Sequence, residues 1–209
     1  MEAEVKFDEV FESKPASQGF LRLYVYTIEG SIPEDRYMRF LDKVSEHARS
    51  LGCETRGMNP PGVTVYCSSK AVLQVSGSTL ADEMGIPPDP EPGEPEDILD
   101  ELGLGPIEPH ETYIHVEVAV TAPLSELGWV KDNIAWILSS MDLLDARYQA
   151  KIVVDRLPRR PGPIESMESG GAKVMYVGGR TVIYLPGAHH LRDPKLYDTL
   201  RKAFLRRWF

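Results

Sequence analysis

The sequence predicts an α+β protein with a largely antiparallel sheet and helices on one face of that sheet. The first observation is an order of elements: each half of the chain reads strand, helix, strand, hairpin and helix. The second is a gapless internal echo, in which residues 65–77 align with residues 175–187 and Tyr66 falls on Tyr176. We therefore predict an internally duplicated β-α-β-β-β-α unit.

The first half, residues 1–85, supplies one copy of this order. Residues 20–28 alternate apolar and polar side chains, which is typical of a strand, and residues 1–12 hold a possible edge strand. Ser31 and Glu34 have the spacing of a capping box. The helix that they would open carries an apolar stripe of Tyr37, Phe40, Leu41, Val44, Ala48 and Leu51. A short strand over residues 53–58, the first hairpin and a short helix near residues 79–84 follow.

Residues 86–111 are predicted to form a linker between the two halves. This segment contains seven prolines, nine acidic residues and no basic residue. Proline removes backbone donors and restricts its neighbours, so a packed element is not expected here. The negative charge of this segment equals the net charge of the whole chain, −9. The rest of the chain is therefore neutral in sum, and net acidity does not exclude an anionic partner.

The second half, residues 112–209, repeats the order of the first. A strand is predicted over residues 113–121, a helix over 125–141 and a strand over 147–155. Residues 156–171 are predicted as a loop rich in proline and glycine. Gly178-Gly179 indicates a second hairpin, and Asp193-Pro194 has the pattern that begins a helix. The order is similar to that of ferredoxin-like folds and of the duplicated TATA-binding protein, by topology alone, because no residue motif of either family is present.

Composition points to a cytoplasmic protein. Hydrophobic residues make up 42% and charged residues 26% of the 209 residues, and no apolar window is long enough to span a membrane. The polar, acidic N-terminus is unlike a signal peptide. Cys53 and Cys67 are too few for a disulfide scaffold, so we expect them to be reduced; a disulfide between them is the alternative, because each precedes or ends a predicted strand. Arg and Glu with prolines in loops would suit a heat-adapted organism.

Tyrosines supply the main candidate binding surface. Six of them fall on strand positions opposite the apolar ones, so they would line the sheet face that helices leave uncovered. Tyrosine also suits any half-buried strand, so a purely structural role is the alternative. The predicted binding residues are Arg22, Tyr24, Tyr26, Tyr66, Tyr113, His115, Glu117, Tyr176 and Tyr184.

Basic residues supply a second candidate, an anion-binding surface on the 156–171 loop and the last helix. Its members are Arg156, Arg159, Arg160, Arg201, Lys202 and Arg206. Such a surface fits phosphate or nucleic acid, and a solvated helix face is the alternative.

Signals for cofactors, metals and catalysis are weak. The glycine pairs do not stand between a strand and a helix, so no phosphate loop is predicted. A zinc site at Cys67, His189 and His190 has no supporting motif, and no cofactor or metal is expected.

Three functions follow from these surfaces. The first is a non-enzymatic binding or assembly protein that uses the tyrosine face to hold a partner protein or a second copy of itself. The second is a nucleic-acid-binding protein regulated by the acidic linker. The third is a small enzyme or cofactor carrier with a site near His115, Glu117, His189 and His190. No membrane partner is expected.

Overall fold

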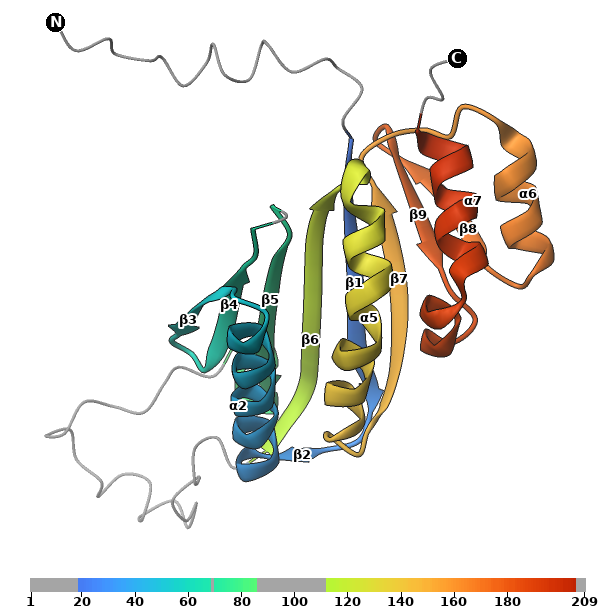
Figure 1. Ribbon diagram of the computed structural model, residues 1–209. Helices are drawn as coiled ribbons and strands as arrows, with labels where there is room; N and C mark the ends of the chain where they lie inside the picture. The colour runs from blue at the N-terminus through green and yellow to red at the C-terminus, as the bar shows by residue number, and fades with distance from the viewer. Residues whose placement is uncertain (1–18, 69, 86–111, 206–209) are drawn as a thin grey trace, which may run out of the picture.

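The computed structural model describes residues 19–68, 70–85 and 112–205, and these residues form one nine-stranded antiparallel sheet (Figure 1). The strands follow the order β3-β4-β5-β6-β1-β7-β9-β8, and the short β2 pairs with β6. Their bounds are β1 Phe20–Glu29, β2 Ile32–Pro33, β3 Glu54–Met58, β4 Gly62–Tyr66, β5 Val72–Thr79, β6 Thr112–Pro123, β7 Arg147–Val154, β8 Lys173–Val177 and β9 Arg180–Tyr184.

The large helices lie on one face of this sheet, on the viewer's side in Figure 1. The predicted α+β class with a large antiparallel sheet is therefore confirmed. Predictions for residues 1–12, the 86–111 linker and Arg206 fall outside the described residues. The helix bounds are α2 Glu34–Ser50, α3 Leu80–Met84, α5 Leu127–Asp142, α6 Pro161–Ser169 and α7 Pro194–Phe204, with 3-10 turns η1 Leu124–Glu126 and η2 Ala188–Arg192.

Local sequence explains where most helices lie, but not how all of them begin. In α2 the predicted stripe is buried from Tyr37 to Ala48, whereas Leu51 is exposed. The predicted capping box at Ser31 is wrong, because Ile32–Pro33 pairs with β6 and Pro33 is the N-cap. A capping box occurs instead at Thr79, whose hydroxyl accepts from Asp82 N while the Asp82 carboxylate accepts from Thr79 N.

The second half contains one helix that the sequence did not indicate. Residues 156–171 were expected to be a loop, yet Pro161–Ser169 forms α6. Its prolines stand in the first turn, where backbone N–H groups make no hydrogen bond within the helix, so proline costs nothing there. Ile164 and Met167 of α6 are buried. The predicted start of α7 is confirmed, because the Asp193 carboxylate accepts a hydrogen bond from Lys195 N at 3.0 Å and Pro194 follows it.

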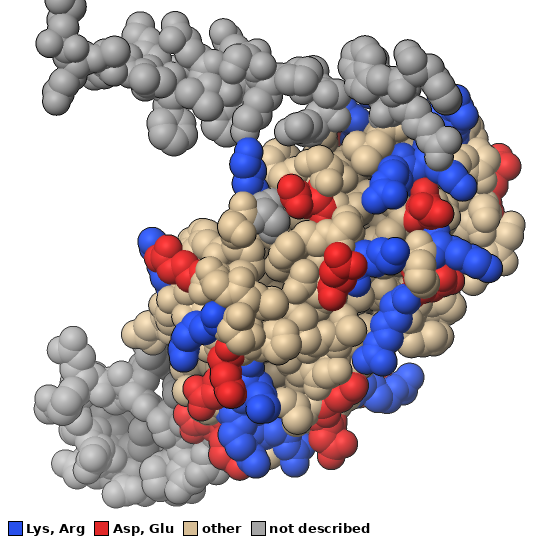
Figure 2. Space-filling model, viewed as in Figure 1, with Lys and Arg blue, Asp and Glu red and all other residues tan. Residues whose placement is uncertain are grey.

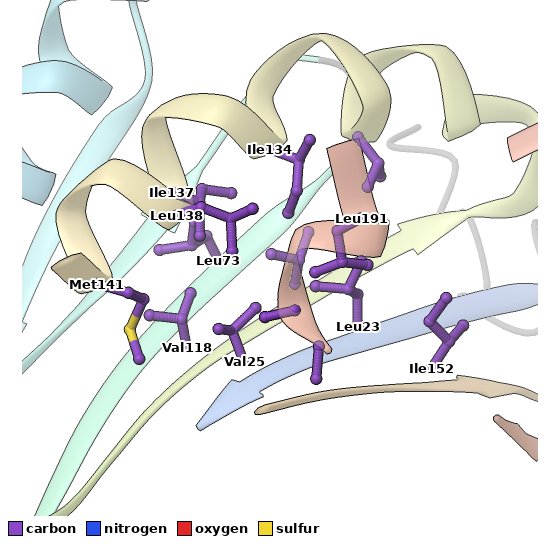
Figure 3. Close-up of a cluster of buried hydrophobic side chains, with 14 of the residues drawn as sticks. Leu23, Val25, Leu73, Val118, Ile134, Ile137, Leu138, Met141, Ile152 and Leu191 are labelled. Atoms are coloured by element: carbon purple, nitrogen blue, oxygen red, sulfur yellow. The ribbon is translucent and has the colours of Figure 1, made fainter. Parts of the chain in front are cut away.

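The core lies between the helices and the covered face of the sheet (Figure 3). Ile134, Ile137, Leu138 and Met141 of α5 point at apolar side chains of the sheet, and Leu191 of η2 fills the same layer. The facing strand residues that Figure 3 labels are Leu23, Val25, Leu73, Val118 and Ile152. Burial of these side chains away from water supplies the main stabilisation of the fold.

The two halves of the chain meet at the centre of the sheet. β1 pairs with β6, β5 pairs with β6 and β1 pairs with β7, so the first strand of each half lies between strands of the other. The two hairpins of the echo take different places: β5 lies next to β6, whereas β7 separates β9 from β1. The duplicated unit and its ferredoxin-like topology are therefore not confirmed by the sheet order.

Cys53 and Cys67 form a disulfide with a Cα–Cα distance of 4.5 Å, which corrects the expectation of reduced cysteines. The register explains the contact, because Glu54 of β3 pairs with Tyr66 of β4, and Cys53 and Cys67 are the adjacent residues just beyond this pair. Disulfides are rare in the cytosol, so the cytoplasmic location stays a prediction. Among the described residues, no helix combines the length and the apolar character needed to cross a lipid bilayer.

Candidate binding face

One face of the sheet is free of the helices that the structure describes, and we call it the open face. Side chains alternate along a strand, so the ladder register tells which residues belong to this face. A single row crosses the sheet from β3 to β8 and includes Arg56, Thr64, Gln74, Ala119, Tyr24, Lys151, Tyr184 and Lys173. The predicted positions of Arg22, Tyr26, Tyr66, His115 and Glu117 are also on the open face, as the burial pattern of their strands shows.

Tyr24 and Tyr26 lie at the centre of the open face on β1, with both rings partly exposed. The Lys151 ammonium of the neighbouring β7 lies 5.1 Å from the Tyr24 ring centroid and 5.7 Å from the Tyr26 ring centroid. A cation at this distance is attracted to the negative face of an aromatic ring. Lys151 therefore holds the two rings together as one aromatic and cationic centre.

Two polar neighbours complete this centre on the side of β6. The Tyr26 ring lies 6.4 Å from the His115 ring, and His115 Nε2 lies 3.9 Å from Glu117 Oε2. Burial raises the pKa of the Tyr26 phenol, and the nearby Tyr184 and Glu117 raise it further. Tyr26 is therefore a neutral hydroxyl at physiological pH, available as a hydrogen-bond donor.

A shallow hollow of about 490 Å³ opens beside Tyr26, toward β8. Its lining combines aromatic, apolar and polar side chains, which is the mixture that suits a protruding side chain of a partner. It is lined by Tyr26, Gln149, Ala150, Gly171, Lys173, Met175, Tyr184, Leu185 and Pro186.

Arginines of the open face are held in ion pairs with neighbouring carboxylates. Asp155 contacts both Arg22 and Arg180 at 2.9 Å. Arg56 Nε lies 2.9 Å from Glu54 Oε1, and its guanidinium carbon lies 5.3 Å from the Tyr66 ring centroid. These pairs orient the arginines and neutralise most of their charge locally.

Tyr113 does not belong to the open face, contrary to the alternation predicted for its strand. A β-bulge between β5 and β6 leaves Ile114 unpaired, because Ser78 pairs with His115 and Thr79 with Tyr113. The extra residue turns Tyr113 to the covered face, where it is 3% exposed. Its ring centroid lies 4.1 Å from that of Tyr37 on α2, so Tyr113 is a core residue.

Tyr176 is also on the opposite side from its predicted place. Val177 pairs with Arg180 across the two-residue turn, so Tyr176 pairs with Thr181, which is buried on the covered face. In the first hairpin five residues separate Tyr66 from its partner Val72, whereas four residues separate Tyr176 from Thr181 in the second. The registers of the two hairpins therefore differ by one residue. A shift of one residue moves a side chain to the other face.

The predicted anion-binding residues are only partly brought together. The 156–171 segment lies against the end of α7, because Arg159 N donates to Ala203 O at 2.9 Å. The Arg156 guanidinium donates to Phe204 O at 2.8 Å, which satisfies a carbonyl in the last turn of α7. Arg159, Arg160, Arg201 and Lys202 are exposed. Figure 2 shows acidic side chains interspersed among basic ones on the helix side.

The histidines that the structure describes do not assemble into one site. His189 and His190 lie in η2 on the covered side, with ring centroids 4.2 Å apart, whereas His115 is on the open face. Cys67 is bonded to Cys53, so it offers no thiolate for the zinc site considered above. The described residues contain no group of three His, Cys, Asp or Glu side chains placed to hold a metal ion.

Sequence reasoning missed Lys151, Asp155 and Arg180 as members of the open face. The alternation of β7 carried a usable signal for Lys151, because the apolar Ala150 and Ile152 flank it. The contact of Asp155 with two arginines had no such signal, since it depends on strands that are distant in sequence.

Comparison of the chain with known protein families, with curated proteins and with solved structures finds no match. The open face must therefore be interpreted from its own chemistry.

Proposed function

We propose that this chain is a non-enzymatic binding protein that holds a partner protein on the open face of its sheet. The observation that carries the proposal is the centre formed by Tyr24, Tyr26 and Lys151, beside the hollow at Tyr184. Tyrosine, methionine and arginine are enriched where proteins meet. Tyrosine also provides a large contact area and a polar tip at a small cost in side-chain entropy.

The ion pairs of this face favour a protein over a nucleic acid. Binding to a phosphate backbone depends on several cations that displace counterions. Arg22 and Arg180 share the single negative charge of Asp155, and Glu54 offsets Arg56, so these three arginines keep only one net positive charge. The nucleic-acid hypothesis therefore has weaker support, and a titration with an oligonucleotide tests it directly.

The catalytic hypothesis loses its geometric support. It needed His115 and Glu117 beside His189 and His190, and these two pairs lie on opposite sides of the sheet. The His115–Glu117 contact stays part of the proposed binding surface, where an imidazole and a carboxylate can orient polar groups of a partner.

Photo-crosslinking tests the proposal at the residue level. A photoreactive amino acid at Gln149, which lines the hollow, should capture a protein in the source cells, and the same group at the exposed Asp132 of α5 should not. The captured protein is then purified and titrated against the wild type and a variant with both Tyr24→Ala and Tyr26→Ala. We expect at least a tenfold loss of affinity, because interface energy concentrates in a few aromatic residues.

Two outcomes would contradict the proposal. The first is equal capture from Gln149 and Asp132. The second is unchanged affinity of the double variant when its circular dichroism matches the wild type. A titration with a labelled single-stranded oligonucleotide completes the test, because tight binding that weakens steeply with salt would favour the nucleic-acid hypothesis instead.

We also propose, as a separate matter, that residues 1–85 and 112–209 are copies of one duplicated unit joined by the 86–111 segment. The matching order β1-α2-β3 and β6-α5-β7, and the pairing of β1 with β6, support this. The ferredoxin-like topology remains an expectation on the same grounds.

A further inference from the structure

The sheet formed by residues 19–68, 70–85 and 112–205 has two edges, which differ in how they are protected against pairing with another strand. At one edge, β3 carries the charged pair Glu54 and Arg56. At the other edge, β8 carries no charge after Lys173, and Met175, Tyr176 and Val177 are 46%, 53% and 58% exposed. Free edges normally carry charges, prolines or bulges that prevent association. We propose that β8 pairs antiparallel with β8 of a second copy of this chain, so that the two sheets continue across a two-fold axis.

The turn between β8 and β9 fixes which backbone groups of β8 point outward. Gly178 and Gly179 both have positive φ, 58° and 76°, which is the geometry of a two-residue hairpin turn. In such a hairpin the closing pair, Val177 and Arg180, exchanges hydrogen bonds. Every second residue of β8 before Val177 then directs its N–H and C=O toward β9, and the residues between direct theirs away from it. The N–H and C=O groups of Val174 and Tyr176 therefore point away from β9.

These outward groups select one register for the pairing. A two-fold axis at Met175 sets Val174 opposite Tyr176 of the second copy, and the reverse, so all four outward groups of each strand segment are paired. An axis at Val174 or at Tyr176 would leave part of this set without a partner. Met175 then faces its own copy in a non-hydrogen-bonded pair, where Cα atoms are about 4.5 Å apart.

The side chains of β8 are self-complementary in this register. Tyr176 would pack on Val174 of the second copy, and an aromatic residue opposite a β-branched one is a favourable cross-strand pair. Lys173 would lie opposite Val177, so no like charges meet. The fit of the strand to its own copy is the reason for naming a second copy as the partner, and it does not depend on what the open face binds.

Cysteine crosslinking tests the register in the full chain. Met175→Cys should form a disulfide-linked dimer under mild oxidation, because a distance of about 4.5 Å between Cα atoms is within the range of a disulfide. Met58→Cys, at the opposite edge and 37% exposed, is the matched control and should stay monomeric on a non-reducing gel. Absence of the Met175→Cys crosslink, or equal crosslinking of both variants, would overturn the proposal.

Light scattering tests the association itself. We expect the wild type to have twice the mass of the 23.4 kDa chain. Met175→Lys should shift it to the monomer mass, since like charges would meet on the axis, whereas Met58→Lys should leave the dimer intact. The variant with Tyr24→Ala and Tyr26→Ala should remain dimeric, which separates this proposal from the proposed function. A monomeric wild type would refute it.

Discussion

Asp155 ties Arg22 to the sheet: Arg22 Nη2 donates to Asp155 Oδ2 at 2.9 Å across the end of the strand pair β1–β7. On the other side, Arg180 Nε of β9 lies 2.9 Å from Oδ1, although Oδ1, which is buried, has no partner in hydrogen-bond geometry. One carboxylate thus contacts cations on two strands, and the two arginines, Arg22 and Arg180, are 158 residues apart in the chain.

We predict that Asp155→Ala lowers the free energy of unfolding by about 1–2 kcal/mol, because a charge-assisted hydrogen bond is lost from a partly exposed pair. The matched control is Asp198→Ala in α7, whose side chain is 66% exposed and whose carboxylate lies 3.9 Å from Arg201, and it should change stability by less than about 0.5 kcal/mol. Urea unfolding followed by circular dichroism measures both. Equal effects of the two substitutions would contradict the prediction.

The disulfide between Cys53 and Cys67 should contribute strongly to the stability of this edge of the sheet. It closes a loop with a sequence separation of 14, so its removal in a Cys53→Ser, Cys67→Ser double variant should cost about 3 kcal/mol. Thermal unfolding with and without a reducing agent measures the effect. The wild type should lose stability on reduction and the double variant should not respond, and a wild type that melts at the same temperature in both conditions would argue against the bond.

Gly77 is required by the tyrosine pair that the bulge in β6 creates. A Cβ at this position would lie 2.8 Å from Tyr113 Cδ1 and 2.9 Å from Tyr37 Cζ. We therefore expect Gly77→Ala to destabilise the protein by about 1–3 kcal/mol, as overpacking of a core does. Gly57→Ala is the control in another strand, since no atom lies within 4 Å of its added Cβ. Chemical denaturation of both variants distinguishes them, and an unchanged midpoint for Gly77→Ala would contradict the packing.

Buried tyrosines should make the fold sensitive to alkaline pH. Burial raises the pKa of Tyr37 and Tyr197 well above the ordinary value, and burial with the Asp142 hydrogen bond raises the pKa of Tyr148 to about 12. The unfolded chain releases these protons near pH 10, before the folded chain does. Stability is therefore full below about pH 10 and falls as pH rises above it.

Ultraviolet absorbance of phenolate, recorded alongside circular dichroism during an alkaline titration, checks this prediction. The buried rings of Tyr37 and Tyr197 should ionise together with loss of structure. Tyr148→Phe should make the decline of stability with pH less steep. Ionisation of every ring at the ordinary pKa with the fold intact would contradict it.

Much of the open face could be predicted from periodicity. The alternation of residues 20–28 places Arg22, Tyr24 and Tyr26 opposite Leu21, Leu23 and Val25, and the structure has the same arrangement. The stripe of α2 was equally visible, because helix period and burial depend on nearby residues. The two misplaced tyrosines show the limit: a bulge moved Tyr113 and a shorter turn moved Tyr176, although both lie in strands.

The sequence by itself determined most element types, α6 excepted, together with the apolar stripes and the central tyrosines, because each follows from a period of two or of 3.6 residues along the chain. Only the tertiary structure decided the strand order, the pairing of Cys53 with Cys67 and the contact of Asp155 with Arg22 and Arg180. These features depend on the register between segments far apart in the chain, and one residue of register reverses the face on which a side chain lies.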